Sequence, residues 1–162
     1  MTGLVADAGT MRELLVVAVD GDRIALAVGD VREVQRAAAP APLPNAPAIV
    51  GGLLNVRGEL VPVLNIRQRL GREDRPLRVS DHLIVARASD RLVAFPVDQV
   101  LELVRIPDSD IIAADALVAG TAHLAGVATL PDGVLVIHDL GQFLTTDELF
   151  ALDHALDGAK AS

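Results

Sequence analysis

Short apolar runs separated by turn residues follow one another along most of the chain. Residues 14–19 and 24–28 flank Asp20-Gly21-Asp22, and a similar arrangement recurs around residues 89–91. An Asp-Gly step between β-prone runs favours a tight hairpin, because glycine tolerates the positive φ that such a turn requires. Many short strands at this spacing are typical of small barrels. Further strands are predicted near residues 31–36, 53–56, 59–64, 83–86, 92–95, 100–106, 127–130 and 134–137.

The chain contains an internal repeat with the same order of features in both copies. Residues 14–36 match residues 83–105 at an offset of 69, and residues 52–70 match residues 126–144 at an offset of 74. The identical pairs include Leu14/Leu83, Val16/Val85, Val28/Val97, Val31/Val100, Glu33/Glu102, Arg36/Arg105 and Gly52/Gly126. Because the offset changes only in connecting loops, the repeat predicts two units of about five strands each. We expect one all-β domain over residues 12–158. Its first subdomain is expected at about 14–72 together with a C-terminal helix at 145–157, and its second at about 82–144.

One helix is predicted near the C-terminal end, over residues 145–157. Thr145 and Glu148 have the spacing of a capping box, in which each side chain accepts a hydrogen bond from the other residue's backbone N–H. Three leucines then share one face, which predicts that the helix packs onto the strands. These leucines are Leu149, Leu152 and Leu156. Gly158 is predicted to end the helix, and residues 1–11 and 159–162 are predicted to be flexible tails.

Composition and charge narrow the kind of partner. The net charge is −8 and no basic run occurs, so neither nucleic acid nor direct membrane contact is expected. The chain has no Cys, Tyr or Trp, which excludes disulfides and thiolate sites and removes the usual platforms for stacking bases. Neither a signal peptide nor a spanning apolar run is predicted. These features favour an acidic protein of the cytoplasm.

The chain offers little material for catalysis. No two of the four histidines have metal-ligand spacing, so neither a metal nor a cofactor is expected. A small hydrolase built on His138-Asp139 is the enzymatic alternative, but no nucleophile that would complete such a site stands out. A free-standing binder of proline-rich peptides is a further alternative, which the scarcity of aromatic residues disfavours. We therefore expect a protein that binds other proteins and has no catalytic residue.

One polar turn stands out between two apolar strands. It comprises Asn55, Arg57 and Gly58, and Glu33 lies on an earlier strand of the same unit. One interpretation is that Arg57 and Glu33 form an ordinary surface ion pair. The other is that Arg57 is held in place to bind a protein partner, a role in which arginine is favoured.

Several motifs occur in a fixed order along the two units. The first unit contains Val31-Arg32-Glu33-Val34, Asn55-Val56-Arg57-Gly58 and Pro62-Val63-Leu64-Asn65-Ile66-Arg67, and a proline-rich loop lies between the first two. The second unit contains Val97-Asp98-Gln99-Val100. Together these motifs closely resemble those of the CheW family of chemotaxis coupling proteins, over about residues 14–156.

The resemblance to the CheW family implies a fold, a role and a site. The implied fold is two packed, five-stranded, SH3-like β-barrels with one C-terminal helix. The implied role is a non-catalytic adaptor that links methyl-accepting receptor tips to the regulatory domain of the histidine kinase CheA, in arrays at the inner face of the membrane. A pathway other than swimming, such as twitching motility, is the alternative within the family. The implied receptor-binding groove comprises Val31, Glu33, Gly52, Asn55, Arg57, Gly58, Val97, Asp98 and Val100.

Overall fold

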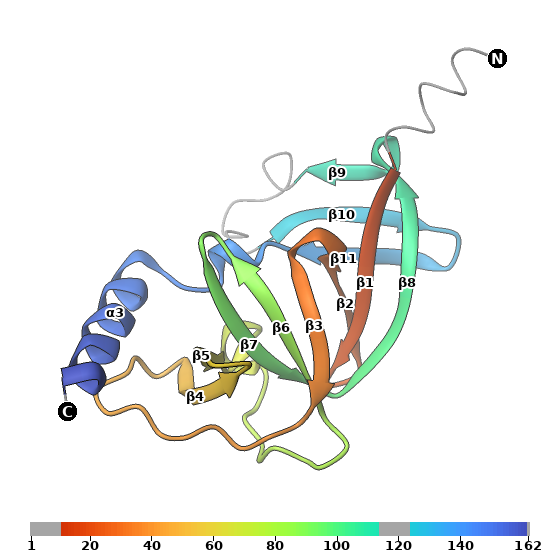
Figure 1. The fold of residues 1–162 in the computed structure, drawn as a ribbon. Coiled ribbons are helices and arrows are strands. Elements are labelled where there is room, and N and C mark those ends of the chain that lie inside the picture. The colour runs from red at the N-terminus through yellow and green to blue at the C-terminus, as the bar shows by residue number, and fades with distance from the viewer. Residues whose placement is uncertain (1–10, 114–123, 162) are drawn as a thin grey trace.

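Two β-sheets and one long helix make up the computed structural model, which describes residues 11–113 and 124–161 (Figure 1). The six-stranded sheet has the order β8-β1-β2-β11-β10-β9, and the five-stranded sheet has the order β3-β6-β7-β5-β4. The strands are β1 (Met11–Val19), β2 (Asp22–Ala27), β3 (Val31–Arg36), β4 (Val50–Val56), β5 (Glu59–Leu64), β6 (His82–Ala88), β7 (Arg91–Val97), β8 (Gln99–Pro107), β9 (Ile111–Ala113), β10 (Leu124–Leu130) and β11 (Gly133–His138). The helices are α2 (Ile66–Arg69) and α3 (Thr146–Ala161), with 3₁₀ turns η1 (Val28–Asp30), η2 (Asp108–Asp110) and η4 (Leu140–Gln142).

Strands β1 and β6 each contain an unbroken apolar run, because both faces of the strand are buried there. On β1, Leu14 and Val16 point into a core inside the six-stranded sheet, whereas Leu15 and Val17 point into a larger core shared by both sheets and α3. Successive side chains of a strand alternate between its faces, so such a strand needs an unbroken apolar run. β6 has the same double role in the five-stranded sheet, which has its own core as well. The described residues therefore form three cores, one within each sheet and one between them.

Helix α3 packs against the shared core on the side of the five-stranded sheet (Figure 1). Its capping box forms as predicted: the Thr145 N–H donates to Glu148 at 2.8 Å, and the Glu148 N–H donates to the Thr145 hydroxyl at 3.1 Å. Leu152 is fully buried in the shared core, and Arg91 of β7 pairs with Asp153. The helix continues past Gly158 to Ala161, so the predicted end at Gly158 is wrong. A glycine inside a helix costs only about 1 kcal/mol, which packing of the rest of the helix offsets.

The sheets do not divide the chain where the repeat predicts. The hairpin β1–β2 belongs to the first repeat, but it pairs with β8 and β11 of the second. The hairpin β6–β7 belongs to the second repeat, but it pairs with β3 and β5 of the first. Each repeat thus lends one hairpin to the other's sheet, which differs from the predicted subdomains at 14–72 and 82–144. The two hairpins have the same apolar pattern, so local signals do not decide which sheet each completes.

Most predicted elements are present, and the prediction of an all-β fold with one C-terminal helix is confirmed. The sheets have six and five strands rather than five each, because the short strand β9 adds to β10. Met11 begins β1 and α3 extends to Ala161, so these positions belong to regular structure rather than to the predicted tails. Residues 1–10 and 162 of those tails lie outside the described residues. Within the described ranges, no helix is long and apolar enough to cross a bilayer.

Candidate protein-binding site

A groove of about 380 Å³ runs between β3 and β8, the edge strands at which the two sheets approach each other. Leu103 is 67% exposed and Val34 is 41% exposed, so two large apolar side chains of the groove face solvent. Its lining residues are Leu15, Val28, Val31, Val34, Val100, Glu102 and Leu103. An open apolar groove with exposed aliphatic side chains is typical of a surface that binds another protein.

The repeat gives the groove two equivalent walls. Val31 and Val34 of β3 correspond to Val100 and Leu103 of β8 at the offset of 69. On a regular strand, residues three apart would face opposite sides. The register of β3 against β6 shifts between Val31 and Glu33. The register of β8 against β1 shifts between Val100, which pairs with Val17, and Glu102, which pairs with Val16. These bulges bring both residues of each pair to the same side, so the two strands line the groove in the same way.

The polar turn between β4 and β5 lies beside the start of β3. Arg57 and Gly58 both have positive φ, 52° and 89°, which makes a two-residue hairpin loop. The Gly58 N–H donates to the Asn55 side chain at 2.8 Å and fixes the turn. Arg57 Nε donates to Glu33 Oε1 at 3.2 Å, while its side chain remains 76% exposed. The turn therefore presents most of the guanidinium to solvent, with Glu33 orienting one side of it.

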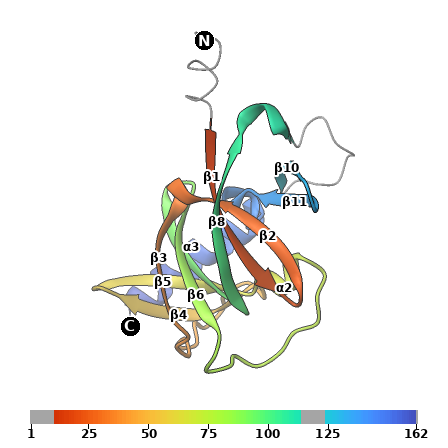
Figure 2. The same ribbon diagram turned by 90° about the vertical axis from the view of Figure 1, so that its right-hand side faces the viewer.

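Ion pairs at this turn join the two edges of the five-stranded sheet. β3 and β4 are the outermost strands of that sheet, yet Glu33 and Arg32 of β3 reach Arg57 and Glu59 beside β4. The sheet is therefore curled, and the β4–β5 hairpin projects from its end (Figure 2). This curvature places the Arg57 turn at the same end of β3 as Val31.

Two residues of the predicted site have structural roles instead. Val97 is 1% exposed and belongs to the core shared by the sheets. Gly52 has a φ of 148°, and a Cβ at this position would lie 2.3 Å from the backbone oxygen of Ala41. Ala41 and Leu53 exchange backbone hydrogen bonds of 2.8 and 2.7 Å there, so Gly52 lets the proline-rich loop close onto β4.

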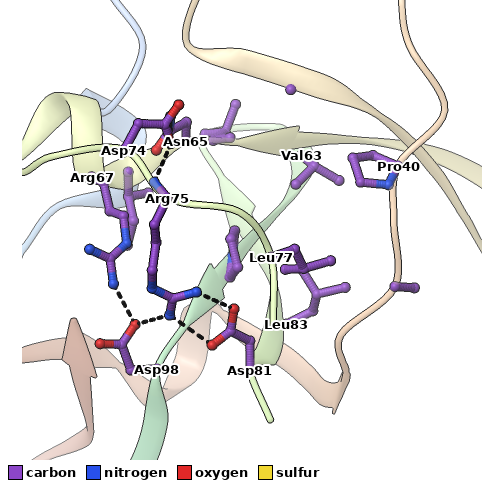
Figure 3. Close-up of a pocket in the computed structure, with 15 residues that line it drawn as sticks. Pro40, Val63, Asn65, Arg67, Asp74, Arg75, Leu77, Asp81, Leu83 and Asp98 are labelled. Carbon is purple, nitrogen blue, oxygen red and sulfur yellow. Dashed lines mark hydrogen bonds and ion pairs between the residues drawn. The ribbon is translucent and has the colours of Figure 1, made fainter. Parts of the chain in front are cut away.

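Asp98 is not among the residues that line the groove, and its carboxylate joins an ionic cluster beside a second cavity (Figure 3). Its carboxylate accepts hydrogen bonds from Arg67 at 2.7 Å and from Arg75 at 2.6 Å. Arg75 also binds both carboxylate oxygens of Asp81, at 2.8 and 2.9 Å. On the other side, Asp98 accepts the Asp20 N–H at 2.8 Å. The cluster borders a second cavity of about 260 Å³ with apolar walls.

The cluster keeps its carboxylates charged. The hydrogen bonds from Arg75 hold the pKa of Asp81 below its ordinary value, although burial opposes the shift. Burial raises the pKa of Asp98, but the donors Asp20, Arg75 and Arg67 together outweigh it and lower that pKa. The same carboxylates raise the pKa of Arg75. Arginines and carboxylates that stay charged and hydrogen-bond to one another in this way are better suited to holding segments together than to proton transfer.

The predicted catalytic alternative, His138-Asp139, lies where β11 leads into η4. Asp139 accepts the Gly141 N–H at 3.0 Å and so caps η4, while His138 is 6% exposed and packs against Phe143 at a ring-centroid distance of 5.9 Å. Among the described residues, no group of three or more His, Cys, Asp or Glu side chains could hold a metal ion. This part of the structure gives the histidine a packing role.

The structure therefore brings together part of the predicted set and disperses the rest. Val31 and Val100 line the groove, and Glu33, Asn55, Arg57 and Gly58 form the adjoining turn; Gly52, Val97 and Asp98 lie elsewhere. Sequence reasoning missed Val34 and Leu103 as lining residues. The signal that would have found them is the repeat itself, which matches these two apolar positions to each other. It also missed Arg67, Arg75 and Asp81, which no local motif connects to Asp98.

Comparisons with known proteins give several matches over most of the chain. A family model for the CheW-like domain matches residues 13–148. A chemotaxis protein CheW from Rhizobium meliloti is 33% identical over 100 residues, which cover 62% of this chain and 64% of that relative. The match thus spans just under two thirds of that relative's length. CheW from Thermotoga maritima is 32% identical over 106 residues, covering 65% of this chain and 70% of its own.

Two further matches extend the comparison. Protein FrzA from Myxococcus xanthus is 31% identical over 109 residues, covering 67% of this chain and 68% of that protein. The crystal structure of the scaffolding protein TtCheW from Thermoanaerobacter tengcongensis superposes with a TM-score of 0.76 at 22% identity, over 85% of this chain and 94% of that one. The structural likeness shows a shared fold, and the family model spans most of the sequence. The chain therefore belongs to the CheW-like family.

Proposed function

We propose that this chain is a non-catalytic adaptor that couples methyl-accepting chemoreceptors to the histidine kinase CheA. Membership of the CheW-like family supports an adaptor role. The groove between β3 and β8 would take the cytoplasmic tip of a receptor, and the regulatory domain of the kinase would bind elsewhere on the same molecule. The chain would then work in the cytoplasm, recruited to receptor arrays at the inner face of the membrane.

The observation that carries the receptor assignment is the open apolar groove with repeated walls. Val34 and Leu103 are exposed although they are large and apolar, and Val31 and Val100 lie beside them on equivalent strands. When a partner covers such exposed aliphatic side chains, apolar surface is removed from water, and this stabilises the complex. Next to them, Arg57 offers an oriented and mostly unused guanidinium at the groove's end.

Calorimetric titrations of the full chain test the proposal. A receptor-tip fragment and the kinase regulatory domain are titrated separately and then in sequence, and we expect both to bind at once. Val100→Glu places a charge in the groove, so it should weaken receptor binding by about 10-fold or more while leaving kinase binding intact. Val134→Glu is the matched control, because Val134 is 68% exposed on β11 and does not line the groove.

Either of two results would contradict the proposal. One is an absence of binding to both partners by a chain whose circular dichroism shows the β-rich fold. The other is an equal loss of receptor affinity in Val100→Glu and Val134→Glu, since that would disconnect binding from the groove.

A second candidate concerns the pathway rather than the mechanism. One relative of this chain, Protein FrzA, does not carry the name CheW. The same adaptor role in a pathway other than swimming, such as twitching motility, is therefore the second candidate. Deleting the gene and scoring swimming and surface motility separately distinguishes the two.

A further inference from the structure

Two exposed arginines extend the walls of the groove. Arg36 lies two residues beyond Val34 on β3, and Arg105 lies two residues beyond Leu103 on β8. The strand register is uninterrupted over both stretches. Residues two apart on a regular strand face the same side, so each arginine stands on the groove side of its strand. Both arginines are exposed to solvent.

The arginines mark opposite ends of the groove. They are equivalent positions of the repeat, at the offset of 69. β3 and β8 run in opposite directions, as the two views of the ribbon show (Figures 1 and 2). Positions equivalent on antiparallel walls lie at opposite ends, so the apolar centre of the groove is flanked by one arginine on each side.

Neither arginine forms an ion pair with any residue that the structure describes. The chain has 22 acidic residues against 14 basic ones, and most of its arginines pair with a carboxylate. Within residues 11–113 and 124–161, the arginines that form no ion pair are Arg36, Arg78, Arg87 and Arg105. Two of these four arginines, Arg36 and Arg105, therefore lie at the ends of the groove between β3 and β8.

The acidic groups that the structure describes near the groove form no ion pair with these two arginines. Glu102 lines the groove but lies 3.6 Å from Arg23, to which it is paired. Glu33 is paired with Arg57. Glu13 stands opposite Arg105 in the register of β1 and β8, but the two form no ion pair. Within the described residues, neither Arg36 nor Arg105 is thus held in an ion pair, in a chain whose net charge is −8.

We propose that Arg36 and Arg105 select a receptor-tip segment whose apolar centre is flanked by a carboxylate on each side. This inference rests on the proposed function and adds the charge pattern of the partner to it. The apolar quartet of Val31, Val34, Val100 and Leu103 would bury the centre of the segment. The arginines at the rim would steer its approach and fix its position, which is the usual effect of complementary charge around an apolar interface.

Charge reversal tests the inference. Arg36→Glu and Arg105→Glu, singly and together, are titrated with a receptor-tip fragment at low and high salt. Each single reversal should weaken binding by about 5-fold to 20-fold at low salt, with a smaller effect at high salt. Arg87→Glu is the matched control, since Arg87 is also an exposed, unpaired strand arginine but lies on β6, outside the groove. Its affinity should match that of the unaltered chain.

A reciprocal change adds a readout that a structural role would not move. A receptor fragment with its flanking carboxylates replaced by lysine should bind the doubly reversed chain more tightly than the unaltered chain. Arg36→Gln and Arg105→Gln serve if a reversed variant does not fold, and they should lose about 3-fold each. If the unaltered chain binds the fragment but all these variants bind equally well, the inference fails and the proposed function stands. If the unaltered chain does not bind the fragment, both fail.

Discussion

Two glycines at equivalent positions of the repeat admit a neighbouring backbone. A Cβ on Gly52 would lie 2.3 Å from the oxygen of Ala41, and a Cβ on Gly126 would lie 2.6 Å from the oxygen of Ile112. In the first copy, Ala41 forms a β-bridge with Leu53 of β4, next to Gly52. In the second copy, β9 pairs with β10 at Gly126. The identity of these two residues in a weakly matching repeat therefore has a steric cause.

Gly52→Ala should destabilise the chain strongly. The φ of 148° is unfavourable for a side chain, and the new methyl group would collide with backbone that cannot yield without breaking the Ala41–Leu53 hydrogen bonds. We expect a loss of about 3 kcal/mol in the free energy of unfolding, measured by urea denaturation. The neighbouring Gly51→Ala is the control, because a Cβ there meets nothing nearer than 3.8 Å. Equal losses in both variants would show that the close approach is not what requires glycine.

A substitution at Arg57 distinguishes its two interpretations, a surface ion pair and a residue that binds a partner. Its side chain is 76% exposed, so the pair with Glu33 at 3.2 Å should contribute at most about 1 kcal/mol to stability. We expect Arg57→Ala to keep the melting temperature nearly unchanged and to weaken receptor binding by about 1–3 kcal/mol. If Glu33 acts by orienting Arg57, the double variant with Glu33→Ala loses less than the two single losses added together. Unchanged affinity for both receptor and kinase would leave Arg57 as an ion pair of the surface.

At the scale of elements, local signals were sufficient to predict every described strand except the short β9. The Asp-Gly turn, the alternating runs and the capping box of α3 each depend on residues close in sequence, and the corresponding hairpins and helix start are present. The exchange of hairpins between the sheets was not predicted. Pairing across a parallel seam, such as Val63 with Ala94, depends on contacts distant in sequence, and either hairpin satisfies the same pattern.

The turn beside the groove was predictable because exposure follows from a turn, whereas Val31 and Val100 were predicted from the family motifs and line the groove. Arg57 and Asn55 are exposed, as expected, because a two-residue loop between strands must be at the surface. Val97 was expected in the groove but lies in the core, since β7 is apolar on both faces and its sequence does not distinguish the groove side from the core side. Asp98, the next residue, lies outside the groove lining as well. Their motif marks a junction between sheets, and the groove begins only at Val100.

At the scale of the molecule, Asp98 lies at the point where the chain passes from one sheet to the other. It follows β7 of the five-stranded sheet and precedes β8 of the six-stranded sheet. Its N–H donates to Ala18 of β1 at 2.9 Å, and its carboxylate binds Arg67 and Arg75 beside the five-stranded sheet. The relative position of β3 and β8, and hence the shape of the groove, depends on this junction.

Acid should therefore weaken the link between the sheets. The pKa of Asp98 and the pKa of Asp81 are both lower in the folded chain than their ordinary value of 3.8. A carboxyl group whose folded pKa is lowered stabilises the fold above the unfolded pKa, and this contribution is lost as the pH falls through the folded pKa. The free energy of unfolding should thus decline as the pH drops below about 4. Asp98→Asn removes the charge but keeps an acceptor oxygen, so at neutral pH it should cost about 2 kcal/mol.

The difference between the unaltered chain and Asp98→Asn is the quantity to follow, by urea denaturation at several pH values from 7 to about 3. It should be largest at neutral pH and should shrink toward zero on acidification, because protonation of Asp98 in the unaltered chain has the same effect as the substitution. Asp90→Asn is the control: Asp90 is exposed in the β6–β7 turn and forms no ion pair with the described residues, so its stability should follow that of the unaltered chain throughout. A difference for Asp98→Asn that stays constant down to the lowest pH would mean that shape and packing, rather than the charge of Asp98, hold the two sheets together.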